Sequence, residues 1–89
     1  MKPAQQLATM DKIIRELDDL KNSQTAVLKK ISQIEADNIN LGSSLLDEGL
    51  PGIHEEIDDA VQKITALIEP FAEYRNKYAE EHPPTGETE

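Results

Sequence analysis

Apolar residues recur along the first half of the chain at alternating spacings of three and four residues. Nine of the eleven positions in this series are apolar, and the series runs without a slip through Met10, Ile13, Leu17, Leu20, Gln24, Val27, Ile31, Ile34, Asn38, Leu41 and Leu45. Such a heptad pattern is typical of a long α-helix whose apolar seam faces another helix. Pro3 suits a first helical turn, because its missing N–H would have no partner there. We expect a helix over about residues 4–47.

The second half repeats the pattern at eight positions, all apolar or aromatic: Ile53, Ile57, Ala60, Ile64, Leu67, Phe71, Tyr74 and Tyr78. This predicts a second helix over about residues 53–81. Between the two series, Gly49 and Gly52 allow positive φ and Pro51 interrupts helical hydrogen bonding, so we expect a turn at 48–52. The predicted fold is all-α, an antiparallel, coiled-coil-like helical hairpin in a single domain of residues 1–82. Residues 83–89 hold no apolar residue except proline and are expected to form a disordered tail.

Counting outward from this turn sets a register in which Gln24 lies opposite Tyr74, where the amide and the phenol can form a hydrogen bond. Pro70 lies inside the second series and should kink or briefly break its helix near residues 66–69.

An alternative architecture is a compact three-helix bundle with helices near 4–21, 24–41 and 53–81. It is suggested by two points at which the first helix could end. Asn22 and Ser23 are both good N-cap residues, and Gly42 is followed by two serines. A break at 22–23 would make the unbroken heptad phase across it a coincidence.

In the hairpin, the first helix would be roughly 65 Å long and the second about 45 Å, at 1.5 Å per residue. The N-terminal third would then extend beyond its neighbour and expose an apolar partner-binding segment of Leu7, Met10, Ile13, Ile14 and Leu17. Further apolar residues at Ile14, Leu28, Leu46, Val61 and Ile68 widen the stripe beyond a two-helix seam. Both features predict a bundle completed by a second copy or by another helical protein.

The net charge of −9 is unevenly distributed along the chain. Residues 31–62 hold eight acidic residues and no lysine or arginine. The helix dipole explains acidic residues in the first turns of a second helix that begins at residue 53, but it disfavours Asp47 and Glu48 at the end of the first. A candidate binding site for a basic protein surface is therefore the acidic tip: Asp47, Glu48, Glu55, Glu56, Asp58 and Asp59.

Composition excludes several classes of chemistry. The chain has no cysteine, and its two histidines have neither the number nor the spacing of zinc ligands. No nucleophile with a base, no phosphate-binding glycine loop and no basic stripe for nucleic acid is present. We expect no enzymatic activity, no cofactor and no metal. Apolar runs are too short for a membrane span or a signal peptide, which predicts a cytoplasmic protein, although export without a signal peptide stays open.

The turn sequence Leu50-Pro51-Gly52 between two helices resembles the Trp-x-Gly turn of the small secreted helical hairpins of the WXG100 type. The resemblance covers the architecture and one glycine, with leucine in place of tryptophan and without the family's export motif. Three functions are thus expected. The first is a non-enzymatic adaptor, small chaperone or assembly subunit that binds through its apolar stripe. The second is an acidic, DNA-mimic-like inhibitor, such as a phage would encode, and the third is a secreted hairpin of the WXG100 type.

Overall fold

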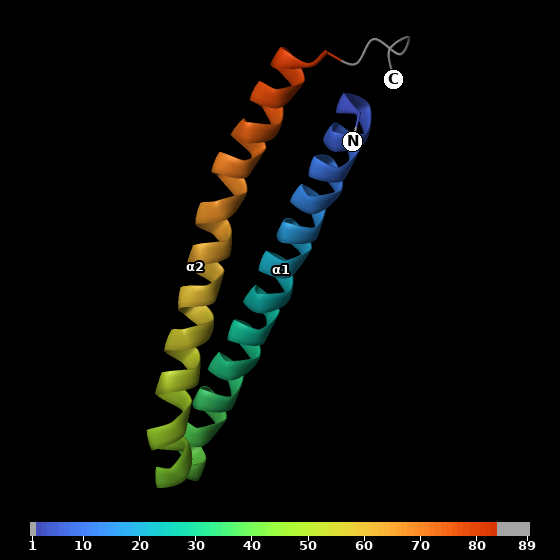
Figure 1. The fold of residues 1–89 in the computed structure, drawn as a ribbon. Coiled ribbons are helices and arrows are strands. Elements are labelled where there is room, and N and C mark those ends of the chain that lie inside the picture. Colours follow the sequence, from blue (N-terminus) through green and yellow to red (C-terminus); the bar gives the residue numbers. More distant parts are fainter. Residues whose placement is uncertain (1, 84–89) are drawn as a thin grey trace.

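The protein is an antiparallel hairpin of two long helices, as the heptad patterns predict. The computed structural model describes residues 2–83, in which α1 (Pro3–Leu41) and α2 (Ser44–Glu81) lie side by side (Figure 1). The molecule measures 66 × 16 × 16 Å. The three-helix alternative is wrong, because α1 continues through Asn22 and Ser23 without a break. Of the predicted tail only Pro83 is described, and 84–89 lie outside the described residues.

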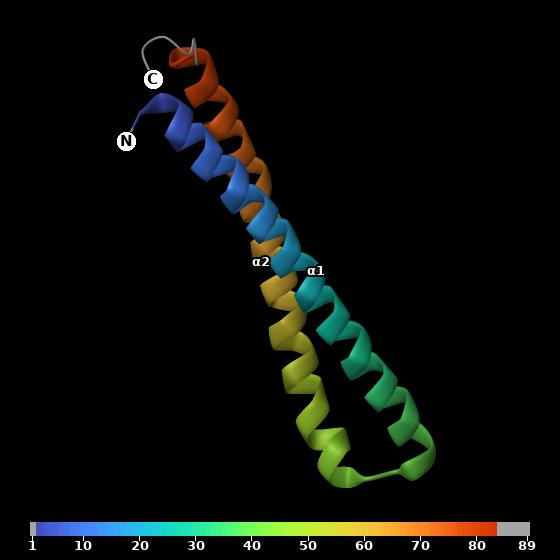
Figure 2. The ribbon, with the colours of Figure 1, turned by 90° about the vertical axis from the view of Figure 1, so that its right-hand side faces the viewer.

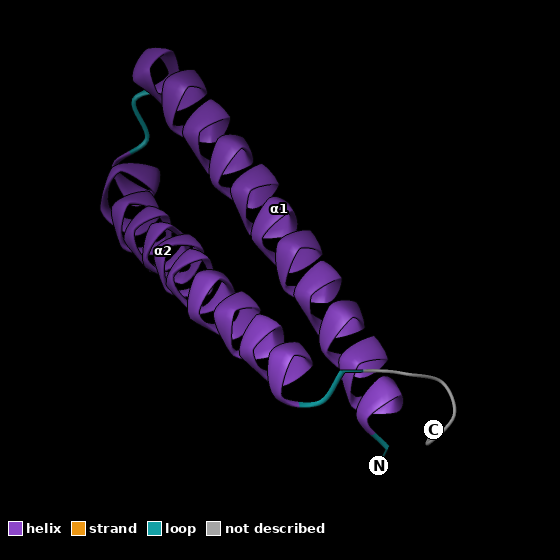
Figure 3. Cartoon of the chain, turned by 90° about the horizontal axis from the view of Figure 1, so that it is seen from above, coloured by secondary structure: helices purple, strands orange, loops and turns teal. Residues whose placement is uncertain are grey.

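The turn lies earlier in the chain than predicted. It consists of Gly42 and Ser43 and appears in Figure 3 as the short loop that joins the two helices. Gly42 adopts φ 71°, the left-handed conformation that ends many helices and that glycine reaches without strain. Ser43 then caps α2, and its hydroxyl accepts a hydrogen bond from the backbone N–H of Leu46. The expected turn at 48–52 is therefore wrong, because those residues lie inside α2.

α2 contains two prolines, Pro51 and Pro70, and yet runs unbroken to Glu81. Each proline removes one helical hydrogen bond, to the carbonyl of Asp47 or of Ala66. All four of these residues are exposed, so water can satisfy the freed carbonyls. The predicted break near 66–69 is wrong, and α2 shows only gentle curvature (Figure 1).

Two polar contacts between the helices mark their register. Arg75 donates from Nε and Nη2 to the two carboxylate oxygens of Asp11, at 2.7 and 3.2 Å. Closer to the turn, His54 Nδ1 lies 2.8 Å from Glu35 Oε1. The register predicted from a turn at 48–52 placed Arg75 opposite Ser23, twelve residues or about 18 Å from Asp11. The expected contact between Gln24 and Tyr74 is wrong for this reason.

The two helices are nearly equal in length, with 39 and 38 residues, and cross at a shallow angle (Figure 2). Over the part of the chain that the structure describes, α1 has no N-terminal overhang beyond α2, and Leu7 and Met10 are buried between the helices. The expectation of an exposed N-terminal third is therefore wrong. It depended on placing the turn about seven residues too late.

The interface between the helices follows a regular heptad of buried and half-buried residues. On α1 these are Leu7, Met10, Ile14, Leu17, Lys21, Gln24, Leu28, Ile31, Glu35 and Asn38, and on α2 Leu50, His54, Ile57, Val61, Ile64, Ile68, Phe71, Arg75 and Tyr78. Within residues 2–83, only Leu7, Met10, Ile31 and Leu50 form a buried apolar core, and no large side chain is fully enclosed. The hairpin alone is therefore a thin structure with little interior.

Candidate functional site: an exposed apolar face

Each helix carries a row of large apolar residues outside the interface. They recur every seven residues and comprise, on α1, Ile13, Leu20, Val27, Ile34 and Leu41, and on α2, Ile53, Leu67 and Tyr74. Their exposed fractions range from 37% for Ile13 to 71% for Leu41. Ala60 fills the missing place in the α2 row and is half-buried. We call these nine residues the exposed apolar face.

The two rows lie on the same side of the hairpin. Apart from Leu41, which precedes the turn, each row residue immediately precedes an interface residue, and the next interface residue follows three positions later. Ile13 thus precedes Ile14 on α1, and Ile53 precedes His54 on α2. An antiparallel helix pair has a local two-fold axis perpendicular to the plane of the two helices. This axis relates equivalent heptad positions and keeps them on one side of that plane. The nine residues therefore form one continuous strip along the hairpin.

The opposite side of the hairpin has a different character. The positions that flank the interface there are mainly small or polar: Asp11, Asp18, Thr25 and Ser32 on α1, and Asp58, Thr65, Ala72 and Ala79 on α2. The apolar exceptions are Ile39 and Pro51, near the turn. Asp11 forms the ion pair with Arg75 on this side. An isolated hairpin with no further partner has no physical reason for such a difference, because both sides would face water.

The sequence pattern found these apolar residues but assigned them wrongly. The predicted seam combined true interface residues, such as Ile31, with members of the exposed apolar face, such as Ile34. Conversely, Ile14, Leu28, Val61 and Ile68, expected to widen the stripe, belong to the interface, and Leu46 is half-buried beside the turn.

The predicted apolar segment does not form one surface. Leu7 and Met10 are buried, Ile14 and Leu17 are half-buried in the interface, and only Ile13 lies on the exposed apolar face.

The acidic tip remains at the turn end of the molecule, but its physical explanation changes. Asp47 lies in the first turn of α2, where the helix dipole favours it, and Glu48 follows in the same helix, where the dipole no longer disfavours it. Glu55, Glu56, Asp58 and Asp59 instead lie far inside α2, beyond the reach of that dipole. The helix dipole therefore no longer gives a reason to assign a binding role to Asp47 and Glu48.

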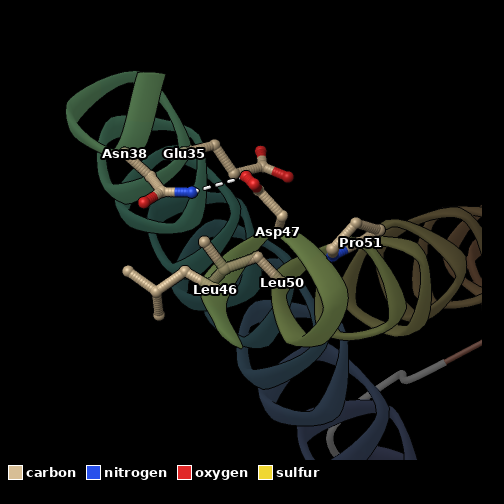
Figure 4. Close-up of a pocket in the computed structure, with 6 residues that line it drawn as sticks. All are labelled: Glu35, Asn38, Leu46, Asp47, Leu50 and Pro51. Carbon is tan, nitrogen blue, oxygen red and sulfur yellow. Dashed lines mark hydrogen bonds between the residues drawn. The ribbon is translucent and has the colours of Figure 1, made fainter. Parts of the chain in front are cut away.

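Asn38 organises the turn beside this acidic tip. Its side chain is 5% exposed, and its Oδ1 accepts a 2.9 Å hydrogen bond from the backbone N–H of Ser43. Its Nδ2 donates to the Ser43 carbonyl at 3.3 Å and to Asp47 Oδ1 at 2.7 Å. Figure 4 shows this contact at the rim of an open hollow of about 140 Å³, lined by Glu35, Asn38, Leu46, Asp47, Leu50 and Pro51. The sequence analysis took Asn38 as a polar member of the heptad series, so its role in the turn was missed.

A second hollow, of about 260 Å³, is formed by a single stretch of α2: Tyr74, Lys77, Tyr78 and Glu81. Within residues 2–83, no three histidine or acidic side chains come together as a metal site would require. His54 contacts Glu35 across the interface rather than Asp58 on its own helix.

Neither described helix has the length of apolar sequence that a membrane crossing requires. Comparison with family models, curated proteins and solved structures gives no match for this chain. The Leu50-Pro51-Gly52 segment, on which the resemblance to WXG100-type hairpins depends, lies within α2 instead of at the turn.

Proposed function

We propose that this protein is a non-enzymatic interaction module that binds a helical protein through the exposed apolar face. The observation that carries the proposal is the seven-residue spacing of that face over almost the whole length of both helices. A continuous strip of this kind matches the groove into which a further helix packs. Each helix of the hairpin contributes one side chain to that groove every two turns. Adaptors, small chaperones and assembly subunits work in this way.

The face is large enough to support binding. Complete burial of an aliphatic side chain is worth roughly 1.5–3 kcal/mol relative to full exposure. Most face residues retain about half of their surface, so each would contribute on the order of 1 kcal/mol in a well-packed complex. Summed over the strip, this offsets the several kcal/mol of freedom lost on association.

The proposal is tested by photo-crosslinking at two matched positions. Ser23 lies three residues after Leu20, at the margin of the face, whereas Gln33 is exposed on the outer surface of α1. A photoreactive phenylalanine analogue at position 23 should crosslink to a helical protein, and the same analogue at position 33 should not. Leu20→Glu should abolish the crosslink from position 23 while the circular dichroism of the hairpin is retained. Equal crosslinking from both positions, or a crosslink that survives Leu20→Glu, would contradict the proposal.

A further inference from the structure

We infer that the occupant of the exposed apolar face is a second copy of this chain, packed in the antiparallel orientation to form a four-helix bundle. The inference depends on the proposed function, because it names the partner of the same face. Three independent features of the hairpin support it: its surface area, the arrangement of its apolar positions, and the charges along the margins of the face.

The hairpin exposes more surface than a compact protein of its mass. A 9.9 kDa globular monomer exposes about 5,200 Å², whereas this chain exposes 6462 Å². Two copies merged into one compact body would expose about 8,600 Å² and would thus bury about 4,300 Å² in total. This area lies within the roughly 2,000–5,000 Å² of obligate homodimers. A second hairpin therefore supplies the interior that one hairpin lacks.

The arrangement of apolar positions matches the centre of a four-helix bundle. On α1 the face residues alternate with interface residues at steps of three and four, as in Met10, Ile13, Leu17, Leu20, Gln24, Val27, Ile31 and Ile34. On α2 the combined row is Ile53, Ile57, Ala60, Ile64, Leu67, Phe71, Tyr74 and Tyr78. Each combined row points midway between the neighbouring helix and the exposed face. In a bundle this direction is the central axis, which all four helices share.

Side-chain size favours the antiparallel orientation. The contacts of Arg75 with Asp11 and of His54 with Glu35 place Leu20 at about the level of Leu67, and Val27 at about the level of Ala60. In a parallel dimer four leucines would meet in one layer, and two valines and two alanines in the next. In an antiparallel dimer with its two-fold axis near Ser23, the large pair of one copy, Leu20 and Leu67, packs beside the small pair of the other, Val27 and Ala60. The layers are then evenly filled, as close packing requires.

The charges along the margins of the face allow ion pairs between two copies. Six exposed charged residues each lie three positions after a face residue: Glu16, Lys30, Asp37, Glu56, Lys63 and Lys77. A two-fold axis near Ser23 brings Glu16 opposite Lys30 of the second copy, whereas Glu56 and Lys77 are out of register with each other by about one turn or more. Symmetry doubles the first pairing to two pairs, and the parallel orientation also offers two, between Lys30 and Glu56.

The antiparallel orientation also separates the two acidic tips. Residues 31–62 carry a charge of −8, whereas residues 1–30 carry +2. Head-to-tail packing places the two stretches of charge −8 at opposite ends of the bundle. Parallel packing would bring two acidic tips together, at a cost in repulsion.

Sedimentation equilibrium of the full chain at micromolar concentration tests the assembly. We expect a dimer for the wild type and for Gln33→Glu, which adds the same charge on the outer surface. The double variant Leu20→Glu with Leu67→Glu should be a monomer with unchanged helical circular dichroism, because both residues are exposed in the hairpin. A wild-type monomer, or a double variant that remains dimeric, would overturn the inference.

Spin-label distances test the orientation. The chain has no cysteine, so Asn40→Cys introduces a single label near the turn. An antiparallel dimer centred near Ser23 separates the two copies of position 40 by about 50 Å, at 1.5 Å per residue. A parallel dimer brings them within about 20 Å, two helix diameters. The short distance would overturn the orientation.

Charge reversal gives an independent measurement of the margin pairs. Glu16→Lys alone and Lys30→Glu alone should each weaken dimerisation about tenfold at low salt. The two changes combined should restore it to within about threefold, because the opposed charges are exchanged. Additive weakening in the combined variant would contradict this pairing.

The outcomes also separate this inference from the proposed function. If the wild type is a monomer and position 23 crosslinks only to a different helical protein, the second copy is wrong and the interaction module stands. If neither self-association nor a crosslink specific to position 23 is found, both proposals fail.

Discussion

Asn38 and Asp47 join the two helices across the turn through a 2.7 Å hydrogen bond from Nδ2 to Oδ1. The same amide satisfies the backbone N–H and carbonyl of Ser43, so one buried side chain fixes the end of α1, the loop and the start of α2. Buried polar groups with all their hydrogen bonds made specify one conformation. Asn38 therefore determines where the chain reverses.

Replacing Asn38 with alanine should destabilise the hairpin by about 2 kcal/mol, because the Ser43 N–H loses its partner. Urea unfolding followed by circular dichroism measures this change. Asn40→Ala, at an exposed neighbouring position, is the matched control and should change the free energy of unfolding by less than about 0.5 kcal/mol. Equal effects of the two substitutions would show that Asn38 does not hold the turn.

Alanine substitutions at three glycines distinguish the observed turn from one at 48–52. Gly42→Ala should destabilise by about 1–2 kcal/mol, because its φ of 71° disfavours a side chain. Gly49→Ala and Gly52→Ala should each stabilise by about 0.5–1 kcal/mol, since both are helical and a new Cβ meets open space. Thermal unfolding gives the signs. Stabilisation by Gly42→Ala with destabilisation by the other two would move the turn to 48–52.

Ile31 and Ile34 are equivalent in the sequence pattern but differ in the structure, with exposed fractions of 6% and 38%. At concentrations low enough to keep the chain monomeric, Ile31→Ala should cost about 2–4 kcal/mol and Ile34→Ala less than about 1 kcal/mol. At high concentration the cost of Ile34→Ala should rise, because association then buries that residue. A cost of Ile34→Ala that does not depend on concentration would argue against binding through the face.

The paired hydrogen bonds between Arg75 and Asp11 should show coupling in a double-mutant cycle. With both side chains partly exposed, we expect a coupling of about 0.5–1 kcal/mol that decreases at 1 M salt. Arg75→Lys should lose part of it, because an ammonium group cannot reproduce the two-point geometry. A cycle with Arg75 and Asp18, which is not its partner in the structure, should give no coupling. Coupling with Asp18 instead of Asp11 would indicate a different register.

Much of the fold could be predicted from the sequence because it depends on local patterns. Heptad spacing predicted two long helices, and Pro3 correctly marked the start of the first. The turn was missed because Gly49, Pro51 and Gly52 are stronger turn signals than Gly42 and Ser43 when each is considered alone. Gly49, Pro51 and Gly52 lie at exposed positions of α2, and this exposure lets the helix continue through them. Whether a single residue is exposed cannot be derived from its neighbours in sequence.

The sequence by itself determined that this protein is a pair of helices with a third apolar position in each heptad, because helical periodicity is a local property of the chain. Only the tertiary structure decided which of those positions face inward. A hairpin gives each helix a single neighbour, and that neighbour covers two apolar positions per heptad. The turn at Gly42 and the cross-helix contacts of Arg75 and His54 set the register that selects those two and leaves Leu20, Ile34 and Leu67 exposed.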